Sequence, residues 1–184
     1  GFLDPQTEGF TLANYVKVLT HPYYLGALKN TLIIGIGGMV GACLLGVPLA
    51  YFTARYVIRG RSLIATLAVL ALVSPPFIGA YSWVVVAGNN GWLTQQMKAL
   101  GVTLPTIYGM HGIILVFSLK FFPFVYLMTE SALRNINRSF EEAAENLGCS
   151  RWERFYKITL PLVFPATSSG AILCFVLSIA DFGT

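Results

Sequence analysis

Residues 134–161 read RNINRSFEEAAENLGCSRWERFYKITLP, the longest polar stretch in an otherwise apolar sequence. The stretch separates two apolar runs that are each long enough to cross a membrane. We refer to residues 134–161 as the elbow, because their pattern predicts two short helices joined by a glycine. The fold class that follows is all-α, a polytopic bundle of transmembrane helices with the elbow between two spans.

The helices of the elbow are predicted from their starting and ending residues. Ser139 and Glu142 have the spacing of a capping box, in which the serine hydroxyl and the glutamate carboxylate each accept a backbone N–H. Ser150 and Glu153 repeat this spacing. Gly148 is expected to end the first helix, since glycine adopts the left-handed conformation at a helix C-terminus without strain.

The first helix of the elbow is predicted to carry one apolar face. Its members follow the i, i+3, i+4, i+7 pattern: Phe140, Ala143, Ala144 and Leu147. The two alanines would let the backbone of another protein approach closely, between larger side chains at both ends. One interpretation is a docking surface for a partner protein. The other is an amphipathic connector that lies at the lipid interface.

A longer motif runs through the same residues. It has seven positions at fixed spacing within 20 residues: Glu142, Ala143, Ala144, Gly148, Ile158, Leu160 and Pro161. This motif resembles the EAA loop of binding-protein-dependent ABC importer permeases, and the flanking apolar segments extend the resemblance over nearly the whole chain. Residues 30–32 and 180–184 are most similar to the ferric-iron branch.

The resemblance implies a fold like that of type I ABC importer permeases and a location in the bacterial inner membrane. Such a subunit forms the translocation path, and the seven motif residues would couple it to a separate cytoplasmic ABC ATPase. The other implied partners are a periplasmic or extracellular substrate-binding protein and a second permease half, either a separate copy or fused. ATP and Mg²⁺ would bind the ATPase, so no cofactor is expected in this chain. Ferric iron is the cargo that the branch suggests; polyamines, thiamine, phosphonate or other anions are the alternatives.

Composition independently places the chain in a membrane. Of its 184 residues 55% are hydrophobic and only 11% are charged, with a mean hydropathy of +0.68, whereas soluble domains average about 25% charged residues. The net charge of +4 comes from basic residues clustered in two short loops, which does not indicate a nucleic-acid partner. Because the sequence begins at Gly1 and stops at the end of an apolar run, we expect a fragment of a longer permease.

Four membrane spans are expected, at about residues 31–53, 63–86, 108–128 and 160–181. Gly35, Gly38 and Gly41 lie along one side of the first span, and Gly37 and Gly41 form a small-xxx-small pair. Small residues allow helices to pack closely in lipid, so this side is predicted to contact another span.

Four residues within the spans are candidates for lining the translocation path: Pro75, Pro76, Lys120 and Asp181. The two prolines must break or kink the second span, and such breaks occur either at a path or as simple kinks. Lys120 lies deep in the third span and is expected to face the bundle or the path. Asp181 has two interpretations, a helix end in water or a carboxylate at the outer mouth that favours cations.

The orientation follows from the basic residues in the loops, which are enriched on the cytoplasmic side. Residues 54–62 hold three lysines or arginines and residues 130–158 hold five, against one in residues 87–107 and two in residues 1–29. The sequence therefore predicts that the N-terminus lies outside and the elbow inside.

No catalytic or metal-binding motif is present in the sequence. It has no Walker A loop, no H-E-x-x-H and no G-x-S-x-G, and its three scattered cysteines indicate neither a disulfide framework nor a metal site. The chain is therefore expected not to be an enzyme, and an intramembrane enzyme is the least supported class. A channel or ion-coupled carrier is the other alternative, with Lys120 and Asp181 as its only candidate coupling residues.

Overall fold

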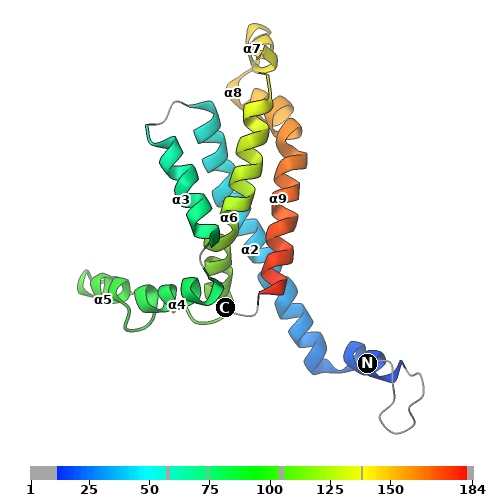
Figure 1. The fold of residues 1–184 in the computed structure, drawn as a ribbon, viewed down its shortest axis with the longest axis vertical. Coiled ribbons are helices and arrows are strands. Elements are labelled where there is room, and N and C mark those ends of the chain that lie inside the picture. The colour runs from blue at the N-terminus through cyan, green and yellow to red at the C-terminus, as the bar shows by residue number, and fades with distance from the viewer. Residues whose placement is uncertain (1–11, 57–58, 74, 104–105, 138, 182–184) are drawn as a thin grey trace. The chain divides into compact units, whose positions relative to one another are not determined.

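The computed structural model of the protein is entirely helical over the residues that it describes (Figure 1), which are 12–56, 59–73, 75–103, 106–137 and 139–181. Its contacts divide the chain into two units, Gly1–Ile33 and Ile34–Thr184. The described part of the first unit holds α1 (Ala13–Thr20) and the beginning of α2 (Pro22–Arg55).

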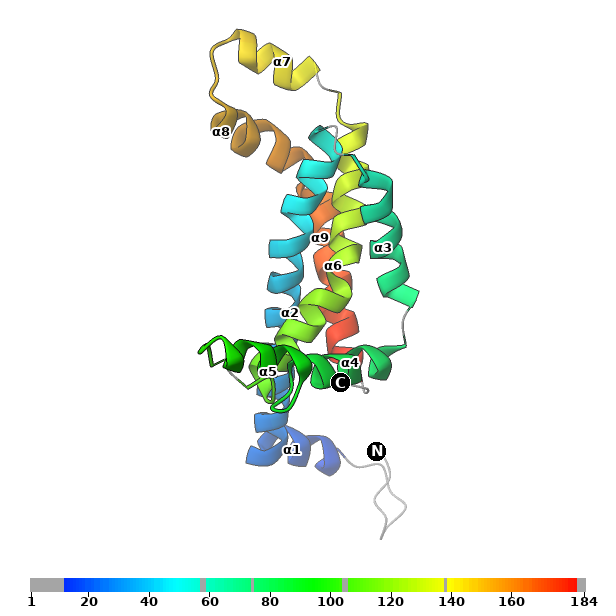
Figure 2. The ribbon, with the colours of Figure 1, turned by 90° about the vertical axis from the view of Figure 1, so that its left-hand side faces the viewer.

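The second unit contains the rest of α2 and all later helices: α3 (Arg61–Val73), α4 (Pro76–Ala87), α5 (Trp92–Ala99), α6 (Met110–Asn135), α7 (Ser139–Asn146), α8 (Arg151–Arg154) and α9 (Leu160–Ala180), with a π-helical turn at Phe155–Thr159. Within this unit, the later part of α2 runs beside α3, α6 and α9 (Figures 1 and 2). Helices α4 and α5 run across one end of these four, and α7 and α8 lie at the other end (Figure 2).

The predicted packing of the small-residue side of α2 is confirmed. A Cβ added at Gly37 would lie 2.7 Å from Ile114 Cδ1, and one added at Gly41 would lie 2.0 Å from Ser118 Oγ. Both neighbours belong to α6, and neither distance is possible between real atoms. The helices approach this closely because these two positions have no side chain.

Two further glycines allow backbone-level contact with α6. A Cβ at Gly46 of α2 would lie 3.0 Å from the carbonyl oxygen of Phe122, and one at Gly170 of α9 would lie 2.9 Å from Cα of Val125. Helix α6 therefore receives α2 and α9 on adjacent parts of its surface. The buried residues form two clusters: Ala42, Phe117, Phe121, Val125 and Cys174 in one, and Ala50, Ala68, Tyr126, Leu133 and Val163 in the other.

Polar contacts add to the packing of α6 against α9. The hydroxyls of Thr129 and Thr167 are 2.9 Å apart, and the Cys174 thiol donates to the Phe121 carbonyl at 3.2 Å. Each contact satisfies groups that would be costly to leave unpaired in an apolar bundle.

Three helical segments among the described residues are long and apolar enough to cross a membrane: Pro22–Arg55, Met110–Asn135 and Arg151–Ala180. The expected span at residues 63–86 is instead divided. Pro75 is extended, with φ −56° and ψ 139°, and Pro76 begins a new helix, so the predicted helix break is confirmed. The 13 residues of α3 rise about 20 Å, less than the roughly 30 Å of a hydrocarbon core, and α4 turns across the bundle.

We predict that Gly41→Val destabilises the protein by about 1–3 kcal/mol, because the new side chain must displace α6. Thermal unfolding in detergent measures the effect, with Gly26→Val as the matched control. Gly26 lies in the same helix, and a Cβ there meets nothing within 4 Å. An equal loss of stability in both variants would mean that helix propensity, and not packing, sets the cost.

Candidate functional site

The elbow turns sharply at the glycine that the sequence singled out. Gly148 has φ +83°, its N–H donates to the Glu145 carbonyl at 2.9 Å, and the Cys149 N–H donates to the Ala144 carbonyl at 3.0 Å. These two bonds together form a Schellman motif, which satisfies the last carbonyls of α7. The direction of the chain after α7 is therefore fixed by hydrogen bonds and a left-handed residue.

The capping box at the second helix is confirmed. The Glu153 N–H donates to Ser150 Oγ at 3.3 Å, and the Ser150 N–H donates to the Glu153 carboxylate at 3.0 Å. Two backbone donors at the start of α8 are thereby satisfied. A carboxylate in this position also interacts favourably with the positive end of the helix dipole.

The capping of the first helix differs from the prediction. Ser139 is the first residue inside α7, and its N–H donates to the side-chain oxygen of Asn137 at 3.0 Å. An asparagine side chain accepts such a bond as well as a serine hydroxyl does. The Asn137 side chain therefore accepts a backbone N–H at the start of α7, where the sequence predicted a capping box of Ser139 and Glu142.

One ion pair joins the two elbow helices, and a second lies within the later part of the elbow. Arg154 of α8 pairs with Glu145 of α7, and Lys157 lies 3.2 Å from Glu153 one turn away. The Arg154 side chain is 16% exposed, whereas that of Glu145 is 63% exposed. A surface ion pair contributes little energy, but this one joins two segments on either side of the Gly148 turn.

The expected apolar face of α7 is divided between two environments. Phe140 is 59% exposed and Leu147 is 84% exposed, and Ala143 and Glu145 are exposed beside them. Ala144 is 7% exposed, so this chain itself covers it. The surface left open consists of two large apolar side chains with a small residue between them, held at the tip of a rigid turn.

The last three motif residues lie elsewhere. Ile158 belongs to the π-turn, and Leu160 and Pro161 open α9. Ile158 and Leu160 are half-buried, whereas Pro161 is exposed. The structure thus places the first part of the motif on α7, and the last part where the elbow joins α9.

The π-turn was not expected from the sequence. Such turns are rare and commonly occur at functional positions. Here the turn makes α8 continuous with α9, and it carries Phe155, whose ring packs edge-on against Tyr51 of α2 with centroids 5.3 Å apart. The elbow is therefore held at both ends, by α6 before it and by α2 and α9 after it.

The two ionisable residues that the sequence placed in spans meet each other. Lys120 of α6 forms an ion pair with Asp181, the residue that ends α9, and their side chains are 17% and 5% exposed. The Lys120 Nζ also lies 4.9 Å from the centre of the Phe121 ring and 6.0 Å from that of Phe117, within range of cation–π attraction. Asp181 therefore does end α9, as one interpretation expected, but its side chain is buried against Lys120 and does not lie in water.

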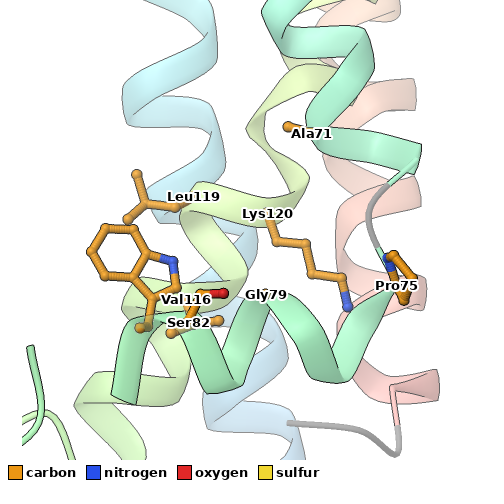
Figure 3. A pocket seen from close by; sticks show the side chains of 8 residues that line it. Ala71, Pro75, Gly79, Ser82, Val116, Leu119 and Lys120 are labelled. Carbon is orange, nitrogen blue, oxygen red and sulfur yellow. The ribbon is translucent and has the colours of Figure 1, made fainter. Parts of the chain in front are cut away.

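Lys120 also borders a hollow of about 410 Å³ at the helix break (Figure 3), lined by Ala71, Pro75, Gly79, Ser82, Trp83, Val116, Leu119 and Lys120. Figure 3 shows the Lys120 side chain extending along the hollow toward Pro75. Three of the four candidate path residues are thus brought together, with Asp181 reached through Lys120, while Pro76 begins α4.

We predict that Lys120→Met costs about 3–5 kcal/mol of stability, because it removes the cation facing a buried carboxylate. Asp181→Asn should also destabilise, and the double variant should recover most of the loss. Thermal unfolding of all three in detergent, with Lys98→Met as an exposed control, gives the coupling energy. Additive losses in the double variant would contradict a direct interaction.

The sequence matches a family model described as "Binding-protein-dependent transport system inner membrane component" over residues 46–184. Similar proteins include the putative ferric transport system permease protein FbpB 1 of Haemophilus influenzae, 29% identical over 98% of this chain and 29% of that protein. The sulfate transport system permease protein CysT of Escherichia coli is 29% identical over 97% of this chain and 64% of that protein.

The molybdenum transport system permease protein ModB of Haemophilus influenzae is 31% identical, over 86% of this chain and 69% of that protein. This chain therefore spans less than a third of the ferric relative but about two thirds of the sulfate and molybdenum relatives.

Among solved structures, one chain of a bacterial alginate ABC transporter aligns with this chain with a TM-score of 0.71 at 21% identity. That transporter was crystallised with its alginate-bound periplasmic protein, and the alignment covers 90% of this chain and 59% of that chain. That likeness establishes the fold, and the match over residues 46–184 establishes that the chain belongs to the family of binding-protein-dependent transport system inner membrane components.

Proposed function

We propose that this chain is the membrane-spanning permease subunit of an ATP-driven importer, and that its elbow transmits movement from a separate cytoplasmic ATPase. The observation that carries the proposal is the open apolar face of α7. Phe140 and Leu147 are exposed, one at the start of α7 and one just after its last residue, beside the turn fixed by Gly148. Exposed apolar anchors on a rigid element suit a protein partner.

In this proposal the motif residues have two roles: some contact the ATPase, and the others connect the elbow to the bundle. Glu142, Ala143 and Ala144 shape the helix that enters the ATPase, and Gly148 sets its angle. Ile158, Leu160 and Pro161 join the elbow to α9, so that movement of α7 reaches the bundle. ATP and Mg²⁺ bind the ATPase in this scheme, and a substrate-binding protein and a second permease half complete the importer.

The buried pair argues against the ion-coupled alternative. That alternative needs ionisable residues within the spans as coupling sites, and Lys120 and Asp181 were its only candidates. Because the two side chains neutralise each other, the pair has a structural role that requires no coupling ion. An importer driven by a partner ATPase needs no charged coupling residue inside its spans.

Ferric iron is the cargo that we propose to test first, on the similarity of residues 30–32 and 180–184 to the ferric branch and on the ferric relatives. Relatives named for sulfate and molybdenum transport make those oxyanions the principal alternatives. Asp181 does not help to choose between them, because a carboxylate paired with a lysine presents no net negative charge to a cation.

We predict that Gly148→Val lowers transport by about tenfold or more while the permease still inserts and binds its ATPase. A β-branched residue resists the left-handed conformation, so the turn must change. Substrate-stimulated ATP hydrolysis and uptake in proteoliposomes measure the effect. Gly101→Val is the matched control, since Gly101 also has a positive φ of +76° and open space around it but lies outside the elbow.

If Gly148→Val transports normally with normal ATPase stimulation, the elbow is only a connector between two spans. If both glycine variants lose transport equally, backbone strain alone explains the loss. In either case the proposed role of the elbow fails, while membership of the family is unaffected.

We further propose that the N-terminus lies outside and the elbow in the cytoplasm, on the basic-residue counts of the loops. Single cysteines at Asn90 and Asn146, both exposed positions, should then react with a membrane-impermeant maleimide from opposite sides, in a background without the natural cysteines. Asn146 should react only after the cytoplasmic face is opened. Labelling of both from the same side would contradict this topology.

A further inference from the structure

A second hollow lies at the elbow end of the bundle, between α2 and the start of α8. It has a volume of about 420 Å³ and is lined by Val47, Pro48, Tyr51, Phe52, Tyr56, Arg151, Trp152 and Phe155. We call it the aromatic groove. It is separate from the open face of α7, since it shares no residue with Phe140, Ala143 or Leu147.

Aromatic side chains form most of the aromatic groove. Tyr51 packs edge-on against Phe155, and Phe52 lies against Tyr56 with ring centres 5.9 Å apart. Phe52, Tyr56 and Trp152 nevertheless remain 52%, 51% and 72% exposed. Tyrosine and tryptophan rings in such positions are favoured at the boundary between lipid tails and head groups, where one part is apolar and another is wet.

The aromatic groove also carries one positive charge without a carboxylate. The other described basic residues of the elbow are each paired: Arg134 with Glu130, Arg154 with Glu145, and Lys157 with Glu153. Arg151 forms no ion pair among the described residues, and no acidic residue lines the groove. Its guanidinium is therefore available to an external anion, and its planar donors suit a phosphate.

The apolar part of the aromatic groove is long enough to hold the glycerol region and the beginning of one acyl chain of a lipid. Val47 and Tyr56 are nine residues apart at the end of α2, a rise of about 14 Å. Val47 and Pro48 form the apolar end, and Tyr56 lies at the other end, next in sequence to Arg55. One molecule with an apolar chain along Val47 and Pro48 and an anionic group beside Arg151 would complement both parts.

We propose that the aromatic groove binds one anionic phospholipid of the cytoplasmic leaflet, with its phosphate on Arg151 and the start of an acyl chain along Pro48 and Val47. The leaflet assignment rests on the proposed orientation. Anionic lipids on the cytoplasmic surface attract juxtamembrane basic residues, so the groove faces a supply of this ligand. A lipid seated there contacts both α2 and α8, and thus bears on the position of the elbow.

The test uses the full-length permease in nanodiscs that contain a trace of photoactivatable phosphatidylglycerol or phosphatidylcholine. After irradiation, mass spectrometry maps the adducts to peptides. Phosphatidylglycerol should label the peptides containing residues 47–56 and 151–155 more than phosphatidylcholine does. Arg151→Gln should lower the phosphatidylglycerol adducts on the order of tenfold, as for one lost charge-assisted hydrogen bond. It should lower the phosphatidylcholine adducts much less, because the choline already neutralises the phosphate of that lipid.

Arg61→Gln is the matched control, because Arg61 is an exposed arginine at the start of α3, outside the aromatic groove. Equal labelling by both lipids, or an equal effect of the two arginine variants, would overturn the proposal in favour of general surface charge. Loss of adducts on adding the ATPase would overturn it in favour of a protein contact. Because the measured quantity is lipid adducts, a failure here is distinguishable from a failure of the transport function.

Discussion

Close backbone contact on α6 is the constraint on which the second unit depends. Helices in lipid gain nothing from expelling water, so their association relies on van der Waals contact at short range. Three glycines allow this close approach: Gly41 and Gly46 of α2 and Gly170 of α9. A Cβ added at any of them would lie 3.0 Å or less from an atom of α6. The two buried clusters and the pair between Thr129 and Thr167 follow from this approach.

The same helix connects the two ends of the unit. In its first half, α6 carries Lys120, which pairs with the residue that terminates α9. At the other end, α6 leads into the elbow, and the elbow returns into α9 through the π-turn. The elbow is thus a bridge between two helices already packed on each other. On the proposed function, a displacement of α7 would act on both of them at once, which suits a transmitted movement better than a flexible loop would.

Local features of the elbow were predictable because their causes are local. Gly148, Ser150 and Glu153 act through residues within five positions, so spacing alone identified the turn and the second cap. The first cap was predicted wrongly because Asn137 and Ser139 compete for the same N-terminus, and short-range spacing does not decide between two capable side chains. The packing side of α2 was predictable for a similar reason, since closely spaced glycines in an apolar span leave a strip of bare backbone that favours a neighbouring helix.

Long-range features were not predictable in the same way. The partner of Lys120 is 61 residues away, and no periodicity links the two positions. The direction of α4 also escaped prediction, because two prolines specify a break but not the angle after it. The π-turn carries Phe155, which packs against Tyr51, a contact between helices distant in sequence. Each of these depends on how helices meet, and that is determined only when the bundle is assembled.

Because Asp181 is paired with Lys120, its carboxylate does not indicate whether the cargo is a cation or an anion. A lone buried carboxylate would carry a large desolvation cost and would attract cations strongly, whereas a pair reduces both. Bound cargo must also leave a transport path, so a strong isolated charge there would retain its counter-ion. A neutralised pair beside the hollow at Pro75 therefore stabilises α6 against the end of α9 without favouring either ferric iron or an oxyanion. Selection between such cargoes would then have to come from groups outside this pair, for which the proposed substrate-binding protein is the natural candidate.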